Sequence, residues 1–415
     1  MTSDAGPEPV SFVGAERPRP DWLRRYPRAW MLAVATVCLG AFMGQLDASI
    51  VTLTYRPIGA SFRAGLGATQ WVSLAYLIAL AALLVPLGAV SDRLGRKRVY
   101  LWGFVLFGLS SLGCAFAPSL LALVGMRAVQ GVGAALLQAN SVALVATSAP
   151  RERLRAALGI QAAAQAVGLA IGPTVGGLLV QTVGWRWVFG VNVPIAVLAV
   201  LAGRFLLPRT RFRRAERDAP GLRAIRTAPG VPRALVGALF AYLMLFGPIV
   251  LLPAVLQGEG ATPLHAGLIV AALPVGFALA AGWADRLLPR RWSSRARSAN
   301  GLAVTAVGLL GLLLAGADVA GDVPALAVIG LGLGVYTPAN NALIMAAVPD
   351  RVAALAGGLV NTSRAIGTAA GTAIVAATYT ATGAPRPAVA ALLAAAGLTA
   401  LTVAPRAARG ATVER

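Results

Sequence analysis

Residues 88–98 read Gly-Ala-Val-Ser-Asp-Arg-Leu-Gly-Arg-Lys-Arg and connect two long apolar segments, 68–90 and 99–116. Each segment is close to the roughly 20 apolar residues that a helix needs to cross a lipid bilayer. The connecting stretch is short and basic, as loops on the cytoplasmic side of membrane proteins usually are. It therefore predicts a turn that joins two transmembrane helices.

The same pattern continues along the chain. Of the 415 residues, 58% are hydrophobic and 12% are charged, and the mean hydropathy is +0.75, whereas a soluble domain has about 25% charged residues. We expect an all-α integral membrane protein with twelve transmembrane helices in two six-helix bundles. The expected spans are 30–54, 68–90, 99–116, 119–147, 155–181, 187–207, 234–256, 265–284, 299–316, 323–347, 352–379 and 387–404.

The basic residues predict the orientation of these spans. With the N-terminus inside, 30 of the 36 Lys and Arg residues lie on the inner side of the membrane and four lie on the outer side. Cytoplasmic loops carry such an excess, so both termini are expected in the cytoplasm. The net charge of +21 then reflects topology, and we expect no nucleic-acid partner.

The preference for Arg over Lys, together with the abundance of Ala and Gly, suggests a GC-rich bacterial genome, so we expect the spans to lie in a bacterial plasma membrane. The domain organisation follows from the spans. The expected parts are a cytoplasmic tail (1–29), an N-terminal six-helix bundle (30–207), a basic cytoplasmic linker with room for a short surface helix (208–233), a C-terminal six-helix bundle (234–404) and a cytoplasmic tail (405–415).

A single acidic residue, Asp47, lies in the outer half of the first apolar segment. A charge in the hydrocarbon core is costly unless it is paired or faces water, so such a residue is a functional candidate. At about 1.5 Å per helical residue, Asp47 lies about 10 Å and Arg127 about 12 Å below the outer surface, so the two can pair. Two interpretations stay open: a static salt bridge, or a proton-coupling pair in which protonation of Asp47 releases Arg127.

The charged stretch 88–98 contains a recognisable motif. Its glycines permit a tight turn, and its acidic residue can bind a neighbouring helix N-terminus or an Arg and so latch the two halves, or can simply cap a helix. The order Gly-x-x-x-Asp-Arg-x-Gly-Arg-Lys resembles the major facilitator superfamily, which implies two halves that rock about a central cavity. The matching residues are Gly88, Asp92, Arg93, Gly95, Arg96 and Lys97.

The fifth segment carries a second motif, formed by Gly168, Gly172, Pro173, Gly176 and Gly177. Glycines every four residues form a face that another helix can approach closely, and packing alone could account for them. The full order Gly-x-x-x-Gly-Pro-x-x-Gly-Gly nevertheless resembles the motif of exporters in the superfamily. With the Leu-Asp pair of the first segment and the aromatic run that follows the fifth, the chain is similar to the drug:proton antiporter branch. That branch is best known for fourteen-helix members, and this chain is expected to be a twelve-helix relative.

Polar and aromatic residues at mid-membrane depth are candidates for lining a substrate cavity. Arg127, Gln130 and Gln138 share one helical face, and Arg364 lies roughly 18 Å from the cytoplasmic surface. Arg364 could bind anionic groups of a substrate or donate to helix carbonyls, and the others could serve helix packing. The candidates are Gln130, Gln138, Gln161, Gln165, Tyr242, Phe246, Tyr336, Asn340, Asn361 and Arg364.

Missing motifs narrow the function classes. The sequence has no Gly-x-x-x-x-Gly-Lys-Ser/Thr loop for ATP and no His-Glu-x-x-His motif, and one His and two Cys residues offer no metal cluster. We expect no enzyme activity, no cofactor and no metal.

The expected function is that of a monomeric proton-coupled antiporter that exports small, mostly apolar or amphipathic compounds across the lipid bilayer. One alternative is a facilitator or proton symporter for a metabolite, and the motif of the fifth segment argues against it. Another is a membrane sensor that has kept the fold, which no residue specifically supports.

The latch interpretation predicts that Asp92→Ala slows turnover more than it weakens substrate binding, because a latch acts on the change between conformations. Equilibrium binding and transport rate, measured on one preparation, check this. Equal transport rates for the variant and the wild type would leave Asp92 as a capping residue only.

Overall fold

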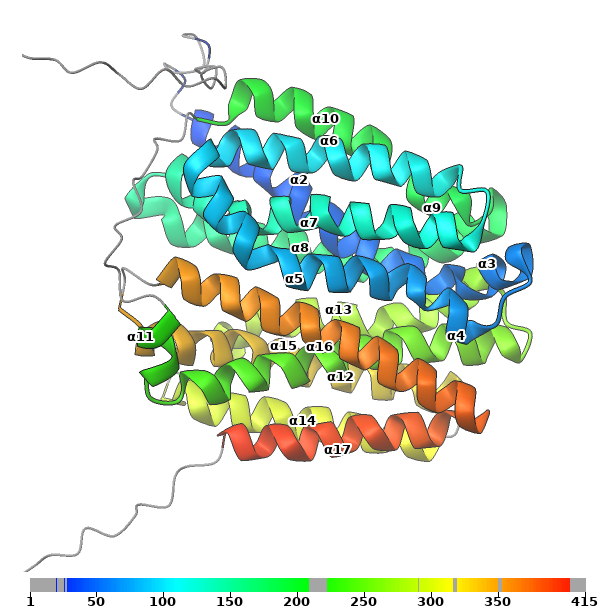
Figure 1. The fold of residues 1–415 in the computed structure, drawn as a ribbon. Helices are drawn as coiled ribbons and strands as arrows, with labels where there is room; N and C mark the ends of the chain where they lie inside the picture. The colour runs from blue at the N-terminus through cyan, green and yellow to red at the C-terminus, as the bar shows by residue number, and fades with distance from the viewer. Residues whose placement is uncertain are drawn as a thin grey trace, which may run out of the picture.

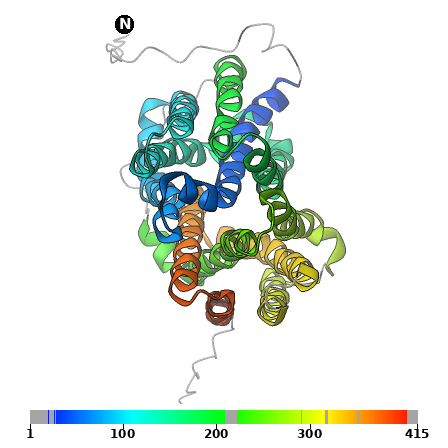
Figure 2. The ribbon, with the colours of Figure 1, turned by 90° about the vertical axis from the view of Figure 1, so that its right-hand side faces the viewer.

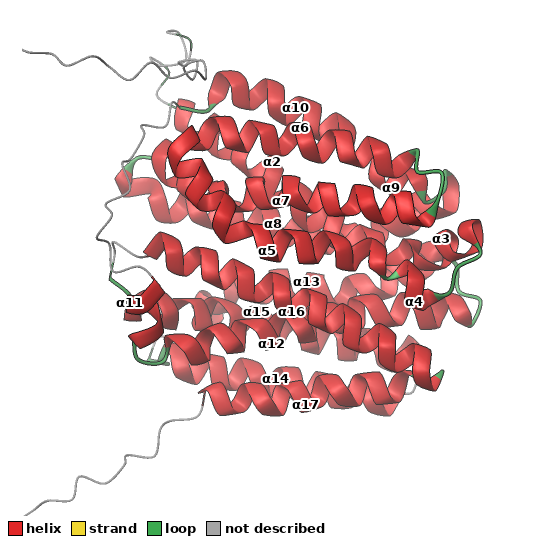
Figure 3. Cartoon of the chain, viewed as in Figure 1, coloured by secondary structure: helices red, strands yellow, loops and turns green. Residues whose placement is uncertain are grey.

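The computed structural model describes residues 20, 26, 28–208, 222–289, 291–315, 319–349 and 353–403. These residues form long helices joined by short turns (Figure 3). Eleven of the helices in these ranges are long and apolar enough to cross a membrane. The expected all-α membrane fold is confirmed.

The first half of the chain packs as one group of helices, blue to green in Figure 1. α2 packs against α8 and α10, and α7 packs against both α5 and α6. The elements are α2 (Ala29–Ile50), η1 (Val51–Thr54), α3 (Tyr55–Phe62), α4 (Leu66–Thr69), α5 (Trp71–Leu94), α6 (Arg96–Ala115), α7 (Leu120–Ser148), η2 (Arg151–Arg153), α8 (Leu154–Thr182), α9 (Arg186–Gly190) and α10 (Asn192–Leu206).

The second half forms the other group, in which α15 packs against α13 and α14, and α12 against α16 and α17. α16, with 30 residues, is a further long helix beside the eleven candidate membrane spans. The elements are α11 (Leu222–Thr227), α12 (Val231–Gly258), α13 (Pro263–Leu287), α14 (Ser294–Ala315), α15 (Val319–Ala347), α16 (Ala353–Thr382) and α17 (Pro385–Val403).

The two halves lie side by side when the molecule is viewed along its helices (Figure 2). Across the boundary, α8 packs against α13 and α5 against α16. A Cβ atom on Gly177 would meet the carbonyl oxygen of Pro263, and one on Gly267 would meet that of Pro173. The backbones of α8 and α13 are therefore in direct contact near the end of the molecule that carries α3, which we call the α3 end.

Arg56 adds a polar contact between the halves at the α3 end. Its Nε donates to the carbonyl oxygen of Ala254, 3.0 Å away, in the last turns of α12. The first expected span, 30–54, was too short, because the helical path continues through η1 into α3 and ends at Phe62. Arg56 therefore lies in a helix instead of the expected loop.

The opposite end carries α11 and the described ends of the linker, and we call it the linker end. Residues 209–221 of the expected linker, and most of the expected tails 1–29 and 405–415, lie outside the described residues. The short helix that the linker could hold is α11. Its Ile225 is 1% exposed and packs with Ile344 and Val360, so this helix is anchored on the second half.

The charged stretch 88–98 is mostly helical. α5 runs to Leu94, and Gly95, with φ 93°, makes the turn into α6. Gly88 does not take part in the expected turn, because it lies inside α5 and faces Ala139. The side chain of Asp92 lies outside the described part of the chain, so the latch stays a hypothesis.

Lys97 has a structural contact that its sequence context did not reveal. Its side chain is 3% exposed, and Nζ donates to the carbonyl oxygens of Arg204 at 3.0 Å and Leu207 at 2.7 Å. A cation suits the last carbonyls of a helix, where the helix dipole is negative. Lys97 thus ties the start of α6 to the end of α10.

The glycine face of α8 packs on α2. A Cβ on Gly168 would meet the carbonyl oxygen of Phe42, one on Gly172 would meet Ser49, and one on Gly176 would meet Ile50. The close helix approach expected from the spacing is present, and α2 is the partner.

The packing predicts that Gly168→Val destabilises the protein, because the new side chain would meet the main chain of α2, which cannot rotate away. We expect a cost of about 1–3 kcal/mol, seen as a lower melting temperature in detergent. Gly125→Val on α7 is the matched control, since a Cβ at Gly125 meets no atom within 4 Å. Equal melting temperatures for the two variants would contradict the assignment.

Candidate functional site

The two charges predicted to pair do so in the first half. Arg127 Nη1 donates to Asp47 Oδ2 at 2.6 Å. Asp47 is 0% and Arg127 1% exposed, so both charges are removed from solvent. Such a pair is stable only if the remaining polar atoms also find partners.

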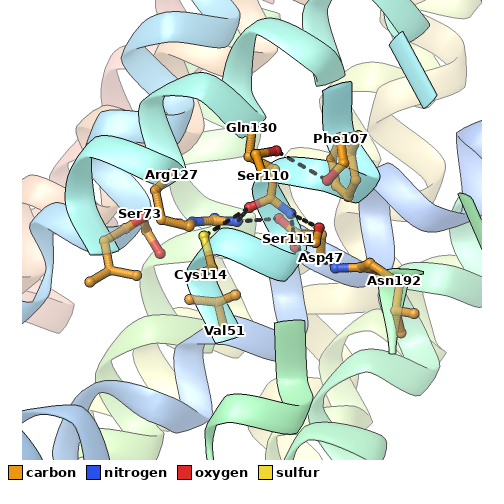
Figure 4. A network of polar contacts seen from close by, with 12 residues as sticks. Asp47, Val51, Ser73, Phe107, Ser110, Ser111, Cys114, Arg127, Gln130 and Asn192 are labelled. Carbon is orange, nitrogen blue, oxygen red and sulfur yellow. Dashed lines mark hydrogen bonds and ion pairs between the residues drawn. The ribbon is translucent and has the colours of Figure 1, made fainter. Parts of the chain in front are cut away.

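Those partners come from neighbouring helices (Figure 4). Asp47 Oδ1 accepts from Asn192 Nδ2 at 2.9 Å and from Gln130 Nε2 at 3.1 Å. Gln130 Nε2 also donates to the Ser111 hydroxyl at 2.7 Å. Both carboxylate oxygens of Asp47 are therefore hydrogen bonded.

The guanidinium of Arg127 is held on several sides. Its Nε donates to the carbonyl oxygen of Val72 at 2.8 Å, and its Nη1 donates to Gln130 Oε1 at 2.5 Å. Its Cζ lies 4.3 Å from the ring centre of Tyr76 and 5.7 Å from that of Phe189. Cations are attracted to aromatic faces at these distances.

We call Asp47, Ser111, Arg127, Gln130 and Asn192 the acid cluster. Its members come from α2, α6, α7 and α10, all in the first half. The roles of Asn192 and Ser111 were not predicted. Asn192 did carry a signal, because it is a polar residue at the start of an apolar segment near the depth of Asp47.

A cavity lies at the boundary between the halves, and six of the ten candidate cavity residues line it. α2, α5, α7 and α8 contribute from one side, and α12 and α16 from the other. Small and apolar residues complete the wall, among them Ala48, Leu77 and Leu80. The six candidates are Gln138, Gln165, Tyr242, Phe246, Asn361 and Arg364.

The other four candidates lie outside this lining. Gln130 belongs to the acid cluster, and Gln161 is 4% exposed within α8. Tyr336 is fully buried in the core of the second half, and Asn340 donates to the carbonyl oxygen of Ala234 at 2.8 Å. Sequence position predicted how deep these residues lie in the membrane. It did not predict whether their side chains face the cavity, because that depends on the rotation of each helix about its axis.

Asp47 itself does not line the cavity. Its neighbours Gln45 and Ala48 do, so the carboxylate lies on the other face of α2. Arg127 and Tyr76 line a second, smaller cavity at the same boundary, opposite Phe246. Arg127 therefore stands between the buried carboxylate and the contact surface of the two halves.

The arrangement of two helical halves around a polar cavity agrees with the comparison to known families. The family model of the Major Facilitator Superfamily matches residues 37–372. The chain belongs to this superfamily. Its members are transporters rather than enzymes, so this major facilitator protein is a multi-pass membrane transporter.

Two relatives match most of this transporter. The riboflavin transporter RibZ of Clostridioides difficile (strain 630) is 28% identical over 83% of this chain and 87% of its own length. The methylenomycin A resistance protein of Streptomyces coelicolor (strain ATCC BAA-471 / A3(2) / M145) is 30% identical over 82% of this chain and 84% of its own length.

A solved structure shares the fold. It is a bacterial homologue of the human lysosomal transporter Spinster in an inward-facing, unoccupied conformation. The two align with a TM-score of 0.68 and 16% identity, over 91% of this chain and 95% of that one.

The geometry of the acid cluster predicts that the free energy of unfolding depends strongly on whether Asp47 and Arg127 neutralise each other. Arg127→Leu leaves the Asp47 carboxylate buried without a cation, and removal of one partner from a buried pair costs about 3–5 kcal/mol. The double variant Asp47→Asn with Arg127→Leu removes both charges, and we expect it to recover most of this loss.

Melting temperatures of the purified proteins measure the effect, with Arg186→Leu as the control. Arg186 is exposed at the α3 end, so its loss should change little. A double variant no more stable than Arg127→Leu would show that charge balance is not what holds the cluster.

Proposed function

We propose that this transporter is a proton-coupled exporter in which Asp47 takes up the proton and Arg127 transmits its effect. One observation carries the proposal. The only acid in the described part of α2 is fully buried, and its ion-pair partner also lines a cavity between the two halves. A charge in such a place couples proton binding to the contact between the halves.

Protonation of Asp47 would change the balance of the cluster. The carboxylate loses its charge while Arg127 keeps its own, so a neutral pair becomes a buried cation, which is costly in a low-dielectric interior. A conformation in which the boundary opens and Arg127 reaches water relieves that cost. Deprotonation restores the pair and favours the closed boundary again.

Two observations favour export. The motif Gly168–Gly177 brings α8 into backbone contact with α2 on one face and with α13 on the other, so it joins the acid cluster to the second half. A relative over most of the chain is named as a methylenomycin A resistance protein. The excess of basic residues supports an orientation with both termini in the cytoplasm, in which the linker end faces the cell interior.

A facilitator or proton symporter for a metabolite is the second candidate. The similarity to a riboflavin transporter over 83% of the chain favours it. The exporter and the symporter differ in the direction in which a proton gradient drives the substrate.

Inside-out vesicles separate these functions. A susceptibility panel on cells with and without the gene first selects a transported compound, with methylenomycin A and riboflavin among those tried. An exporter accumulates the compound in vesicles with an acidic lumen, and a protonophore abolishes the accumulation. A symporter drives the compound out of the same vesicles, and a facilitator equilibrates it without regard to pH.

Asp47→Asn should abolish accumulation driven by the proton gradient, because the side chain no longer exchanges a proton. Folding and insertion should stay largely intact, because the amide oxygen of Asn can still accept a hydrogen bond from Arg127. Glu259→Gln is the matched control, an exposed acid at the end of α12. Full gradient-driven transport by Asp47→Asn would remove this residue from the coupling mechanism.

A further inference from the structure

Arg364 supplies the formal charge in the described wall of the cavity between the two halves, which we call the boundary cavity. Its Cζ lies 5.1 Å from the ring centre of Tyr242. Nη1 is 3.5 Å from Asn361 Oδ1, at the outer limit of a hydrogen bond, and the buried Nε has no hydrogen-bond partner in the described chain. Leaving a buried donor unsatisfied costs free energy, so the guanidinium of Arg364 has capacity for a further hydrogen-bond acceptor.

No acidic side chain in the described wall of the cavity pairs with Arg364. The lining holds no Asp or Glu residue among those described. Asp47 is on the other face of α2 and already binds Arg127, Gln130 and Asn192. The hydrogen bonds of the described residues also give Arg364 no helix carbonyl, which was the alternative from sequence. The cavity is therefore electropositive.

The rest of the wall is suited to a flat ligand. The rings of Tyr242 and Phe246 lie 6.2 Å apart at an angle of 23°, one turn apart on α12. Aromatic rings at such distances and angles stack on other flat groups. Gln45, Gln138 and Gln165 add amide groups around this aromatic surface and can orient a polar edge.

We propose that the boundary cavity binds planar aromatic anions, with a carboxylate or similar oxyanion on Arg364 and the ring system against Tyr242 and Phe246. This assignment rests on the proposed function for its physiological meaning, since it names the substrate class of that transporter. An Arg guanidinium binds a carboxylate through two parallel hydrogen bonds. An organic cation of the same shape would be repelled by Arg364 and would find no carboxylate in the wall.

Equilibrium binding to the purified full-length protein tests this without any transport step. Three probes share one ring system: anthracene-9-carboxylate, its neutral amide and the cation 9-(aminomethyl)anthracene. Wild-type protein should bind the carboxylate at least about tenfold more tightly than the amide, and the cation most weakly. A transporter that fails to couple to protons but shows this preference would refute the proposed function and leave the binding site intact.

Arg364→Gln should remove the preference for the carboxylate and leave the affinity for the amide nearly unchanged. Arg364→Lys keeps the charge but loses the planar pair of donors, so an intermediate preference is expected. If Arg364→Gln does not fold, the preference of Arg364→Lys for the carboxylate over the amide tests the role of Arg364 instead. Arg186→Gln is the matched control, because Arg186 also lies over an aromatic ring, with Cζ 4.5 Å from the Trp185 ring centre, but outside the cavity.

Three outcomes overturn the assignment. They are a wild-type protein that binds the amide or the cation as tightly as the carboxylate, Arg364 variants that keep the full preference, and a folded wild-type protein that does not bind the carboxylate at all.

Discussion

The buried ion pair between Asp47 and Arg127 constrains the packing of the whole first half. Two charges removed from water are costly, and the cost is met only while each keeps its hydrogen bonds. Asn192, Gln130 and the carbonyl of Val72 supply those bonds from α10, α7 and α5. These helices therefore cannot shift separately from α2 without leaving a charge exposed to an apolar interior.

One helix, α2, separates the proposed proton site from the proposed substrate site. The carboxylate of Asp47 faces the acid cluster, while Gln45 and Ala48 on the same helix line the boundary cavity. In the proposed mechanism, proton and substrate therefore do not compete for one carboxylate. Their coupling passes through the position of α2 and through Arg127, which also lines the second cavity.

Sequence patterns were sufficient for features that depend on spacing along one helix. The apolar runs predicted the spans, the four-residue spacing of Gly168, Gly172 and Gly176 predicted a close helix contact, and matching depths allowed the pair of Asp47 and Arg127. Each is a property of a single segment or of distance from the membrane surface.

Sequence patterns did not predict which neighbouring helix each side chain faces, because this depends on how every helix is rotated about its own axis. Gln130 and Gln138 are on one helical face, yet one is in the acid cluster and the other in the cavity wall, because different neighbours cover the two positions. The contacts of Asn192, which lies on α10, and of Lys97, which binds the end of α10, both depend on how α10 packs against α2 and α6. The apolar run ends near residue 54, so hydropathy alone did not show that the helical path continues to Phe62.

The position of Lys97 has a consequence for how α10 can move. This helix is fastened at both ends, by Lys97 on its last carbonyls and by Asn192 on the Asp47 carboxylate. With contacts at both ends, α10 cannot tilt independently of α2 and α6. The three helices therefore move as one rigid body. A tilt that begins at Asp47 is transmitted along α10 to Lys97 and so to the turn at Gly95.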